Sequence, residues 1–444
     1  MFKRKIYEKL LEWKEEYAGS YACLIEGARR VGKSTVAEEF ARREYESYIL
    51  IDFAAVTDDL LDVFRDIADL DLFFLRLQAQ TGITLNERKS VIIFDEVQLY
   101  PRARQAIKYL VKDGRYDYIE TGSLISIKKN VKNIVIPSEE YRIQMYPMDY
   151  EEFLWATGRN PDIVRMISNK HQATGDSTNR SMMRNFRIYM AVGGMPQAVD
   201  AYVSGKNFEQ IDRVKREIIN LYIDDLKKID PSGRLGDIYR STPSQLALKR
   251  SRFSVVSATG KKKTPKDEER LFDLIDSKTV LPCYHVTEPG PVLSQTREFE
   301  KMKLYLSDTG LFTTLLFENG EGIEADIYNK MLSDKLNANL GYLYENAVAQ
   351  TLAANGKELF YHSWRKENST HSYEIDFLLS KNNKLIPVEV KSSAARNHAS
   401  IDCFEEKYSQ HFLKGILFSQ KDFSHIGKLE LRPVYSAEFI IENL

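Results

Sequence analysis

The sequence predicts an α/β protein whose N-terminal third is a parallel sheet with helices on both faces. Short apolar runs alternate with helical patterns from Tyr21 to Ile136, and such alternation is typical of parallel sheets. One run is followed by a glycine-rich loop and a helix, and another ends in two acids. The strands expected for this sheet are Ala22–Ile25, Tyr48–Phe53, Val91–Phe94, Tyr116–Glu120 and Ile134–Ile136.

Composition limits the class of protein. The chain has 444 residues, 43% hydrophobic and 29% charged, which suits a globular protein of about two to four domains. The net charge of −1 means that any nucleic-acid surface has to be a local patch. Cys23, Cys283 and Cys403 fit no metal-ligand spacing, which favours a reducing compartment, and we expect a cytoplasmic protein. The basic N-terminus leads into an amphipathic helix, and no run approaches the roughly 18 apolar residues of a membrane span.

The glycine-rich loop follows the first expected strand. It reads Gly27-Ala28-Arg29-Arg30-Val31-Gly32-Lys33-Ser34, and Thr35 continues into a helix. The glycines let successive backbone N–H groups face phosphate oxygens, and the helix adds the positive end of its dipole. Lys33 is expected to reach the β- and γ-phosphates in a catalytic role, and the Ser34 hydroxyl to ligate Mg²⁺. Residues 27–35 therefore predict a site for ATP with Mg²⁺.

Two acids end the third expected strand. The run before them is apolar enough to be buried on both faces, so Asp95 and Glu96 lie at the sheet edge where such folds bind ligands. We expect Asp95 to hold Mg²⁺, and Glu96 to orient and deprotonate the attacking water. Thr121 and Ser123 follow the next strand. A hydroxyl there can touch the γ-phosphate or the water, and we expect Ser123 to be the catalytic one.

Residues 150–229 are mostly helical in pattern, and residues 227–270 are the most basic window, with 12 Lys and Arg against 5 Asp and Glu. The window includes Lys249-Arg250-Ser251-Arg252 and Gly260-Lys261-Lys262-Lys263. A helix from Thr264 and a strand at Val280–Val286 follow, and this order indicates a winged helix. Two interpretations stay open: contact with the phosphate backbone of DNA or RNA, and an ordinary charged surface.

A third pattern begins near Ser333. The elements expected there are a helix at Ser333–Ala354, strands at Glu358–Trp364, Tyr373–Leu379 and Leu385–Lys391, a helix near Ala399–Tyr408 and a strand at Leu413–Phe418.

Acids and a lysine lie on two of these strands. Glu389 and Lys391 alternate onto one face of a strand, and Asp376 on the preceding strand can meet them. Carboxylates that share a face are costly without a cation between them. Asp376 and Glu389, with Glu345 from the preceding helix, therefore form a candidate metal site, and Lys391 can stabilise charge or activate a water. Pro387 lacks an N–H group, so its strand is expected to be an edge or irregular. A plain ion pair at a sheet edge is the alternative.

These motifs together resemble a family of prokaryotic AAA+-like P-loop ATPases with a C-terminal restriction-endonuclease-like domain of the PD-(D/E)XK type. The resemblance spans nearly the whole chain. Besides the loop, it rests on Phe94-Asp95-Glu96-Val97-Gln98, Thr121-Gly122-Ser123, Glu151-Glu152-Phe153, Gly193-Gly194-Met195-Pro196, Leu306-Ser307-Asp308-Thr309-Gly310-Leu311, Glu374-Ile375-Asp376-Phe377 and Glu389-Val390-Lys391.

The resemblance implies four parts. They are a P-loop ATPase core at residues 1–149, a helical lid at 150–235, a winged-helix-like basic domain at 236–330 and an αβββαβ nuclease-like domain at 331–444. Where the family commonly has a Gly-Arg pair after the sensor strand, this chain has Tyr141-Arg142. Arg142 is therefore only a weak candidate for a phosphate-sensing arginine.

Two classes of function follow. The leading one is an ATP-hydrolysing protein whose C-terminal domain binds or cuts nucleic acid, with Asp376, Glu389 and Lys391 catalytic. The other is an ATP-dependent switch or assembly protein whose C-terminal domain binds a partner without cleavage. A GTPase is disfavoured because Asn169-Lys170 continues as His171-Gln172 rather than the base-reading motif, and the acid pair suits water activation better than a kinase. An oligomer is compatible with both classes, and no membrane partner is expected.

Overall fold

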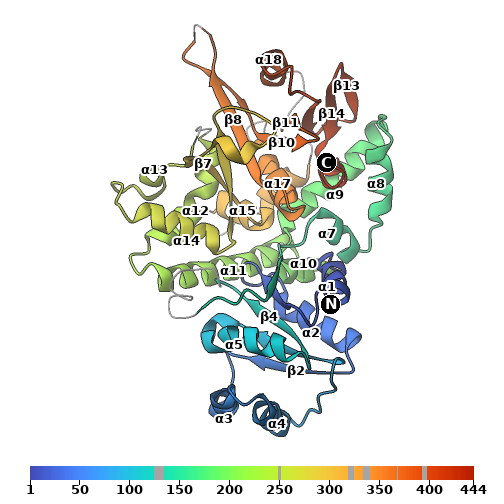
Figure 1. The fold of residues 1–444 in the computed structure, drawn as a ribbon. Coiled ribbons are helices and arrows are strands. Elements are labelled where there is room, and N and C mark those ends of the chain that lie inside the picture. The colour runs from blue at the N-terminus through green and yellow to red at the C-terminus, as the bar shows by residue number, and fades with distance from the viewer. Residues whose placement is uncertain (125–134, 249–251, 319–324, 334–340, 368, 393–397) are drawn as a thin grey trace. The chain divides into compact units, whose positions relative to one another are not determined.

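The structure is a computed structural model that describes residues 1–124, 135–248, 252–318, 325–333, 341–367, 369–392 and 398–444. It forms two compact units, Met1–Tyr146 with Asp276–Lys278, and Pro147–Ile275 with Thr279–Leu444. Figure 1 shows the elements of each unit. Ile134 of the fifth expected strand, Lys249-Arg250-Ser251 of the basic window and residues 334–340 of the expected long helix lie outside the described residues.

The first unit is built on a five-stranded parallel sheet of order β2-β3-β4-β1-β5. Its elements are α1 (Ile6–Glu16), β1 (Ala22–Glu26), α2 (Lys33–Glu44), β2 (Ser47–Asp52), α3 (Asp58–Val63), η1 (Phe64–Asp66), α4 (Leu70–Thr81), β3 (Ser90–Asp95), η2 (Val97–Leu99), α5 (Pro101–Asp113), β4 (Asp117–Gly122) and β5 (Glu140–Gln144). The predicted parallel sheet is confirmed. The fifth strand, however, is β5 rather than Ile134–Ile136. As an edge strand it buries only Ile143, so it carries no continuous apolar run that a sequence pattern could detect.

Apolar residues cover both faces of this sheet. Leu24 of β1 and Phe94 of β3 join one buried cluster with Phe73 of α4 and Ile107 of α5. On the other face α2 packs against β2, β3 and β4, with its buried residues three and four apart along the helix. Burial on both faces is why the central strands read as unbroken apolar runs.

The strand order brings three carboxyl ends together. β4 lies between β1 and β3, with Ile25 of β1 beside Thr121 and Phe94 of β3 beside Glu120. The residues that follow β1, β3 and β4 therefore meet at one edge of the sheet. This edge holds the glycine-rich loop, Asp95 and Thr121.

The second unit is helical at first and then contains two sheets. Its elements are α7 (Tyr150–Ala156), α8 (Pro161–Asn169), α9 (Asp176–Val192), α10 (Pro196–Val203), α11 (Phe208–Ile229), α12 (Arg234–Ala247), α13 (Val255–Thr259), α14 (Asp267–Asp276), β6 (Val280–Val286), η3 (Leu293–Thr296), β7 (Arg297–Leu306), α15 (Thr309–Leu316), α16 (Ala325–Leu332), α17 (Gly341–Ala354), β8 (Leu359–Arg365), β9 (Ser372–Ile375), β10 (Phe377–Lys381), β11 (Lys384–Val390), α18 (Ala399–Lys407), β12 (Gly415–Ser419), β13 (Ser424–Ile426), β14 (Leu429–Pro433), η4 (Val434–Ser436) and α19 (Ala437–Ile441).

The two sheets have the orders β7-β6-β8-β9 and β10-β11-β12-β14-β13. β6 pairs with β7 and also, in parallel, with β8. One sheet therefore combines strands from both sides of the boundary expected at residue 330. The strand expected at Tyr373–Leu379 is two strands, because the chain leaves β9 and enters β10 at Asp376. The Asp376 carboxylate accepts the backbone N–H of Val390 at 2.8 Å.

β11 is a central strand, so the edge position predicted from Pro387 is wrong. It pairs with β10 on one side and with β12 on the other. The N–H groups of Leu385 and Lys391 point toward β12 and the segment before it. Pro387 alternates with them and has no N–H to donate, and regular pairing with β12 resumes only at Val388. The expected irregularity is therefore present, as a gap in the hydrogen bonds between β11 and β12.

Two motifs that lie far apart in the sequence meet in the second unit, Gly193-Gly194-Met195-Pro196 and the segment from Leu306 to Leu311. The Asp308 carboxylate accepts the N–H of Gly194, just after α9, at 2.6 Å and caps α15 through the N–H of Leu311 at 2.8 Å. A Cβ on Gly310 would lie 2.4 Å from the carbonyl oxygen of Val192. The crossing thus needs both a buried acid and glycine.

We expect Gly310→Ala to destabilise the second unit by about 3 kcal/mol or more, because its Cβ overlaps backbone that cannot move aside. Gly290→Ala, where the added Cβ meets nothing within 4 Å, is the matched control and should change the free energy of unfolding by less than about 0.5 kcal/mol. Urea unfolding of the purified variants measures both. Equal stability of the two variants would contradict the close approach.

Candidate functional site

The glycine-rich loop of the first unit closes around its own lysine. Lys33 begins α2, and its ammonium donates to the carbonyl oxygens of Gly27 at 3.1 Å and Ala28 at 2.9 Å. Gly32 has φ +100°, a left-handed conformation that favours glycine. Burial lowers the pKa of Lys33 to about 8, although Glu96 and Asp95 act in the opposite direction. An incoming anion would raise the pKa of Lys33 again, because a nearby opposite charge favours the protonated form.

Arg4 holds this loop from outside the motif. Its guanidinium donates to the carbonyl oxygens of Val31 at 2.8 Å and Tyr146 at 2.7 Å. Arg4 is itself buried. It was not predicted, because nothing in the local sequence connects a basic N-terminus to a loop 27 residues away.

Two hydroxyl groups converge on Asp95. Ser34 donates to Asp95 Oδ1 at 2.7 Å, and Thr121 donates to the same oxygen. This joins the start of α2 and the ends of β3 and β4 at one carboxylate. Of the two hydroxyl residues considered after β4, Thr121 is the one that contacts Asp95, whereas Ser123 is buried beyond the strand end. A catalytic role for Ser123 stays a prediction.

Glu96 occupies an unusual backbone position. Its φ of 52° and ψ of 44° are left-handed, which costs a non-glycine residue about 1–3 kcal/mol and is often found at functional sites. The turn separates β3 from η2. The side-chain amide of Gln98 donates to the Glu96 carboxylate, so Gln98 orients the predicted base.

Buried charges also lie on β4 and β5, with Glu140 at the amino end of β5. Arg104 of α5 makes a two-pronged ion pair with Glu140, with distances of 2.7 and 2.9 Å, and Arg142 lies 3.1 Å from Glu140. Glu120, next to Thr121, is fully buried, and neither of its carboxylate oxygens has a hydrogen-bond partner among the described residues. Burial, and then the charge of Glu140, raise the pKa of Glu120 well above its usual range. Arg142 is thus engaged with Glu140, and its phosphate-sensing role stays a prediction.

The structure brings together the four residues predicted for the C-terminal site. Lys391 Nζ lies 2.8 Å from a Glu389 carboxylate oxygen. Burial alone would lower the pKa of Lys391, but attraction to Asp376 and Glu389 raises it above its ordinary value. Burial also raises the pKa of Glu345 on α17 to about 7. These groups therefore share one electrostatic environment.

Sequence reasoning missed three members of this cluster, which are Lys303, Tyr305 and Glu374. Lys303 of β7 lies 2.7 Å from Glu374 of β9 and 3.4 Å from Glu345. The Tyr305 hydroxyl also donates to Glu345. The sequence feature that could have revealed Lys303 is its position inside the apolar run Met302–Leu306. Within the described ranges, no group of three or more His, Cys, Asp or Glu side chains could hold a metal ion, so the metal role of Asp376, Glu389 and Glu345 stays a prediction.

Part of the basic window is neutralised by its own neighbours. Arg234 pairs with the buried Asp267 at 2.8 Å, and Arg270 contacts both Asp267 and Asp230. Lys261, Lys262 and Lys263 are exposed. Only the first of these three has a carboxylate within ion-pair distance in the described chain, Asp237 at 3.7 Å. The available positive charge is therefore smaller than the residue count suggests.

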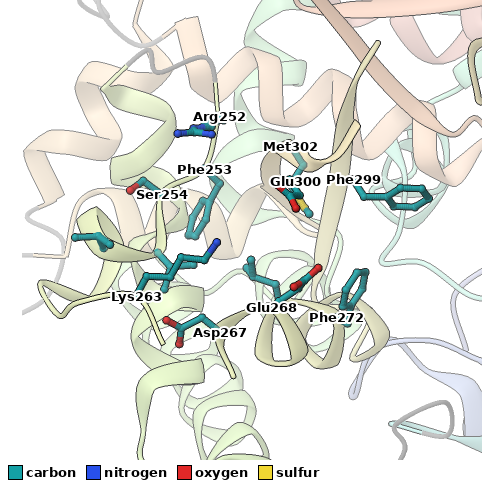
Figure 2. Close-up of a pocket in the computed structure, with 13 residues that line it drawn as sticks. Arg252, Phe253, Ser254, Lys263, Asp267, Glu268, Phe272, Phe299, Glu300 and Met302 are labelled. Atoms are coloured by element: carbon teal, nitrogen blue, oxygen red, sulfur yellow. The ribbon is translucent and has the colours of Figure 1, made fainter. Parts of the chain in front are cut away.

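A pocket of about 240 Å³ is lined by Lys263, the last of these lysines. Figure 2 shows Lys263, Arg252 and Glu300 around it, together with exposed aromatic rings. Phe272 and Phe299 are 41% and 48% exposed. Charged and aromatic side chains thus share one concave surface of the second unit.

The first unit has the strand order and phosphate loop of a P-loop nucleotide-binding domain. Residues 19–154 match the family model of an AAA domain. The chain therefore carries an AAA-type ATPase domain. Residues 183–321 and 340–428 match two domains of unknown function, DUF8612 and DUF4143. A search of curated proteins gave no match.

Three solved structures show weak likeness. A Signal Transduction ATPase with Numerous Domains protein with a tetratricopeptide repeat sensor from Pyrococcus horikoshii is 10% identical, with a TM-score of 0.28, and covers 80% of this chain. Cdc6p from Pyrobaculum aerophilum is 13% identical at a TM-score of 0.25, over 75% of this chain and 93% of its own. PCH-2 from C. elegans is 13% identical at 0.22, over 48% of this chain and 66% of its own. This chain spans only 45% of the Pyrococcus horikoshii protein, and these TM-scores support no inference.

The described helices include none with the length and apolar character that a membrane crossing requires.

We expect Glu120→Gln to remove a pH-dependent cost. Because its pKa is raised, Glu120 in the folded protein keeps its proton at pH values where the unfolded chain has lost it. The free energy of unfolding of the wild type therefore falls as the pH rises above about 4.5, by up to about 1.4 kcal/mol per pH unit. The variant should therefore be more stable than wild type at pH 8 and similar at pH 4. Urea unfolding across this range measures it, with exposed Glu87→Gln as the control. A constant difference at every pH would contradict a buried, protonated Glu120.

Proposed function

We propose that the protein binds ATP with Mg²⁺ at the loop of residues 27–35 and hydrolyses it with Glu96 as the general base. One observation carries the proposal. The hydroxyls of Ser34 and Thr121 meet on one oxygen of Asp95, beside the buried ammonium of Lys33. This is the convergence of lysine, hydroxyl and carboxylate that a triphosphate and its cation require.

Lys33 is poised to exchange partners. Its hydrogen bonds to Gly27 and Ala28 are to neutral carbonyl oxygens, and charge-assisted bonds to phosphate oxygens are roughly twice as strong. Binding of the β- and γ-phosphates therefore draws the ammonium out of the loop. The backbone N–H groups of the loop and the start of α2 add further positive potential.

Ser34 and Asp95 suit Mg²⁺. This ion takes one or two protein oxygens beside a nucleotide and leaves its other positions to phosphates and water. Ser34 supplies a hydroxyl oxygen and Asp95 a carboxylate for the ion or its waters, and Thr121 fixes the carboxylate rotamer. The bound ion would neutralise charge on the β- and γ-phosphate oxygens.

Glu96 supplies the proton acceptor. The attacking water bonds to the γ-phosphorus while one of its protons passes to the Glu96 carboxylate. The bond from that phosphorus to the β–γ bridging oxygen breaks, which gives ADP and inorganic phosphate. The left-handed backbone of Glu96 and its bond from Gln98 fix where this carboxylate lies.

In this proposal the second unit carries the nucleic-acid-binding surface of the ATPase. Lys261, Lys262 and Lys263 are exposed, and Lys263 lines the pocket of Figure 2. They support contact with a nucleic-acid backbone, because lysines bind phosphates and aromatic rings stack on bases. In this proposal the nuclease-like C-terminal domain binds or cuts the same nucleic acid.

A second candidate function is an ATP-dependent switch or assembly protein whose C-terminal domain binds a partner without cleavage. Lys303 favours it, because its ammonium lies against two of the acids of the nuclease-like cluster. The internal ion pairs of Arg234 and Arg270 also favour it, since they reduce the charge available for phosphates.

Substitutions at the nucleotide site test the ATPase. Lys33→Ala should abolish measurable ATP binding. Glu96→Gln should keep binding within a few-fold of wild type and lower turnover by about 10²–10⁴-fold, since an amide cannot accept the water proton. Phosphate release and nucleotide-binding titration measure the two effects, and Glu87→Gln, away from the site, should match wild type. Wild-type turnover by Glu96→Gln would remove Glu96 from the mechanism.

Charge reversal tests the nucleic-acid surface. A triple Lys261→Glu, Lys262→Glu, Lys263→Glu variant should bind single- or double-stranded DNA more weakly, and the slope of log affinity against log salt should become shallower by about 1 per lost contact. The control reverses the exposed Lys9, Lys108 and Lys112 of the first unit, which gives the same net charge. If both variants weaken equally, only bulk charge matters, and the 261–263 segment is an ordinary surface.

A further inference from the structure

Four carboxylates and two lysines gather in the C-terminal part of the second unit. The acids are Glu345, Glu374, Asp376 and Glu389, and the lysines are Lys303 and Lys391. They come from α17, β7, β9, the β9–β10 junction, β11 and the residue after β11. Acids packed so closely repel one another unless cations lie among them.

Lys303 is the deepest of these cations. Its side chain is only 7% exposed, and its ammonium contacts Glu374 at 2.7 Å and Glu345 at 3.4 Å. The charge of Asp376 also acts on it. A lysine so deeply buried would normally lose its proton, and only several surrounding acids can keep it charged.

The surroundings fix this ammonium in place. β7 pairs with β6, where Lys303 lies opposite the buried Cys283, and the ammonium lies 5.2 Å from the centre of the Tyr361 ring. Tyr305, two residues later on the same face, donates its hydroxyl to the Glu345 oxygen that Lys303 approaches. Lys391 forms its ion pair with Glu389, whereas the charge of Asp376 acts on both lysines.

We propose that the ammonium of Lys303 is the resident cation of this carboxylate cluster, and that it occupies the place in which a divalent metal ion would otherwise balance Glu345 and Glu374. The cluster then differs from a metal-dependent nuclease centre: the acids are held by a side chain of the chain itself. This inference is independent of the proposed ATPase. Of the two roles proposed above for the C-terminal domain, it keeps nucleic-acid or partner binding and excludes cleavage at this cluster. It implies that wild-type protein neither binds Mg²⁺ or Mn²⁺ at this cluster nor cleaves phosphodiesters there.

Lys303→Met tests the proposal, because methionine keeps the length of the side chain and removes its charge. We expect this variant to exchange amide hydrogens faster in β7, β9 and α17 than wild type does. Millimolar MnCl₂ should restore slow exchange and raise the melting temperature of the variant by about 3 °C or more, since a bound ion stabilises the folded state. The same MnCl₂ should leave these segments of the wild type unchanged.

The controls separate this site from others. Lys301→Met removes a lysine two residues earlier on β7 and should show no rescue by Mn²⁺. The double variant Lys303→Met with Glu374→Gln should lose the rescue, because the ion then lacks a ligand. Hydrogen exchange is followed by peptide in the full chain without nucleotide, so binding of Mn²⁺ at Ser34 and Asp95 of the first unit is seen separately.

One result would overturn the proposal even if Lys303→Met fails to fold. If calorimetry on the wild type detects Mn²⁺ binding that Glu345→Gln and Glu374→Gln both abolish, the cluster holds metal beside Lys303. Metal-dependent DNA cleavage by the wild type that Glu374→Gln removes would do the same. Absence of both, together with a folded and Mn²⁺-insensitive Lys303→Arg, is the result that we expect.

Discussion

The carboxylate of Asp308 holds the second unit together where α9 and α15 cross. Burial raises its pKa, whereas the N–H groups of Leu311 and Gly194 and the charge of Lys215 act to lower it. Lys215 in turn donates to the carbonyl oxygens of Ala191 at 2.7 Å and Gly310 at 3.4 Å. Backbone can come this close only where side chains are absent, so a buried acid, two glycines and a buried lysine depend on one another.

The same rule, that a buried charge needs partners, distinguishes the two lysines most relevant to function. Lys33 is satisfied by carbonyl oxygens and has its pKa lowered by burial to about 8, so an anionic ligand improves its situation. Lys303 is satisfied by carboxylates, and its pKa is held well above the ordinary value despite burial. A ligand anion would add little stabilisation to Lys303, because carboxylates already balance its charge. The first lysine is therefore available for binding, and the second belongs to the structure of its cluster.

Sequence reasoning predicted what local spacing controls. The loop from Gly27 to Ser34 is contiguous, and the rule that ligands meet the carboxyl ends of parallel strands placed Asp95 beside it. The partners of these groups depend on which strands and segments lie side by side in the fold, and the spacing of residues along the sequence does not reveal this. Arg4 reaches Val31, and Lys303 meets Glu345 only because β7 joins β6, a neighbour of β8. The edge strand β5 was missed for a related reason, since one-sided burial leaves no continuous apolar run.

Asp376 shows why the chemistry of the C-terminal cluster cannot be inferred from loss of activity alone. Its carboxylate accepts the N–H of Val390, at the point where the chain passes from one sheet to the other. An acid at this position therefore has a structural task, to satisfy a backbone donor that the broken strand no longer pairs. Asp376→Ala would leave that donor unsatisfied and loosen β11, on which Glu389 lies. Asp376→Asn keeps the acceptor oxygen and removes the charge. Only a comparison of the two variants therefore separates the role of Asp376 in the fold from a role in chemistry.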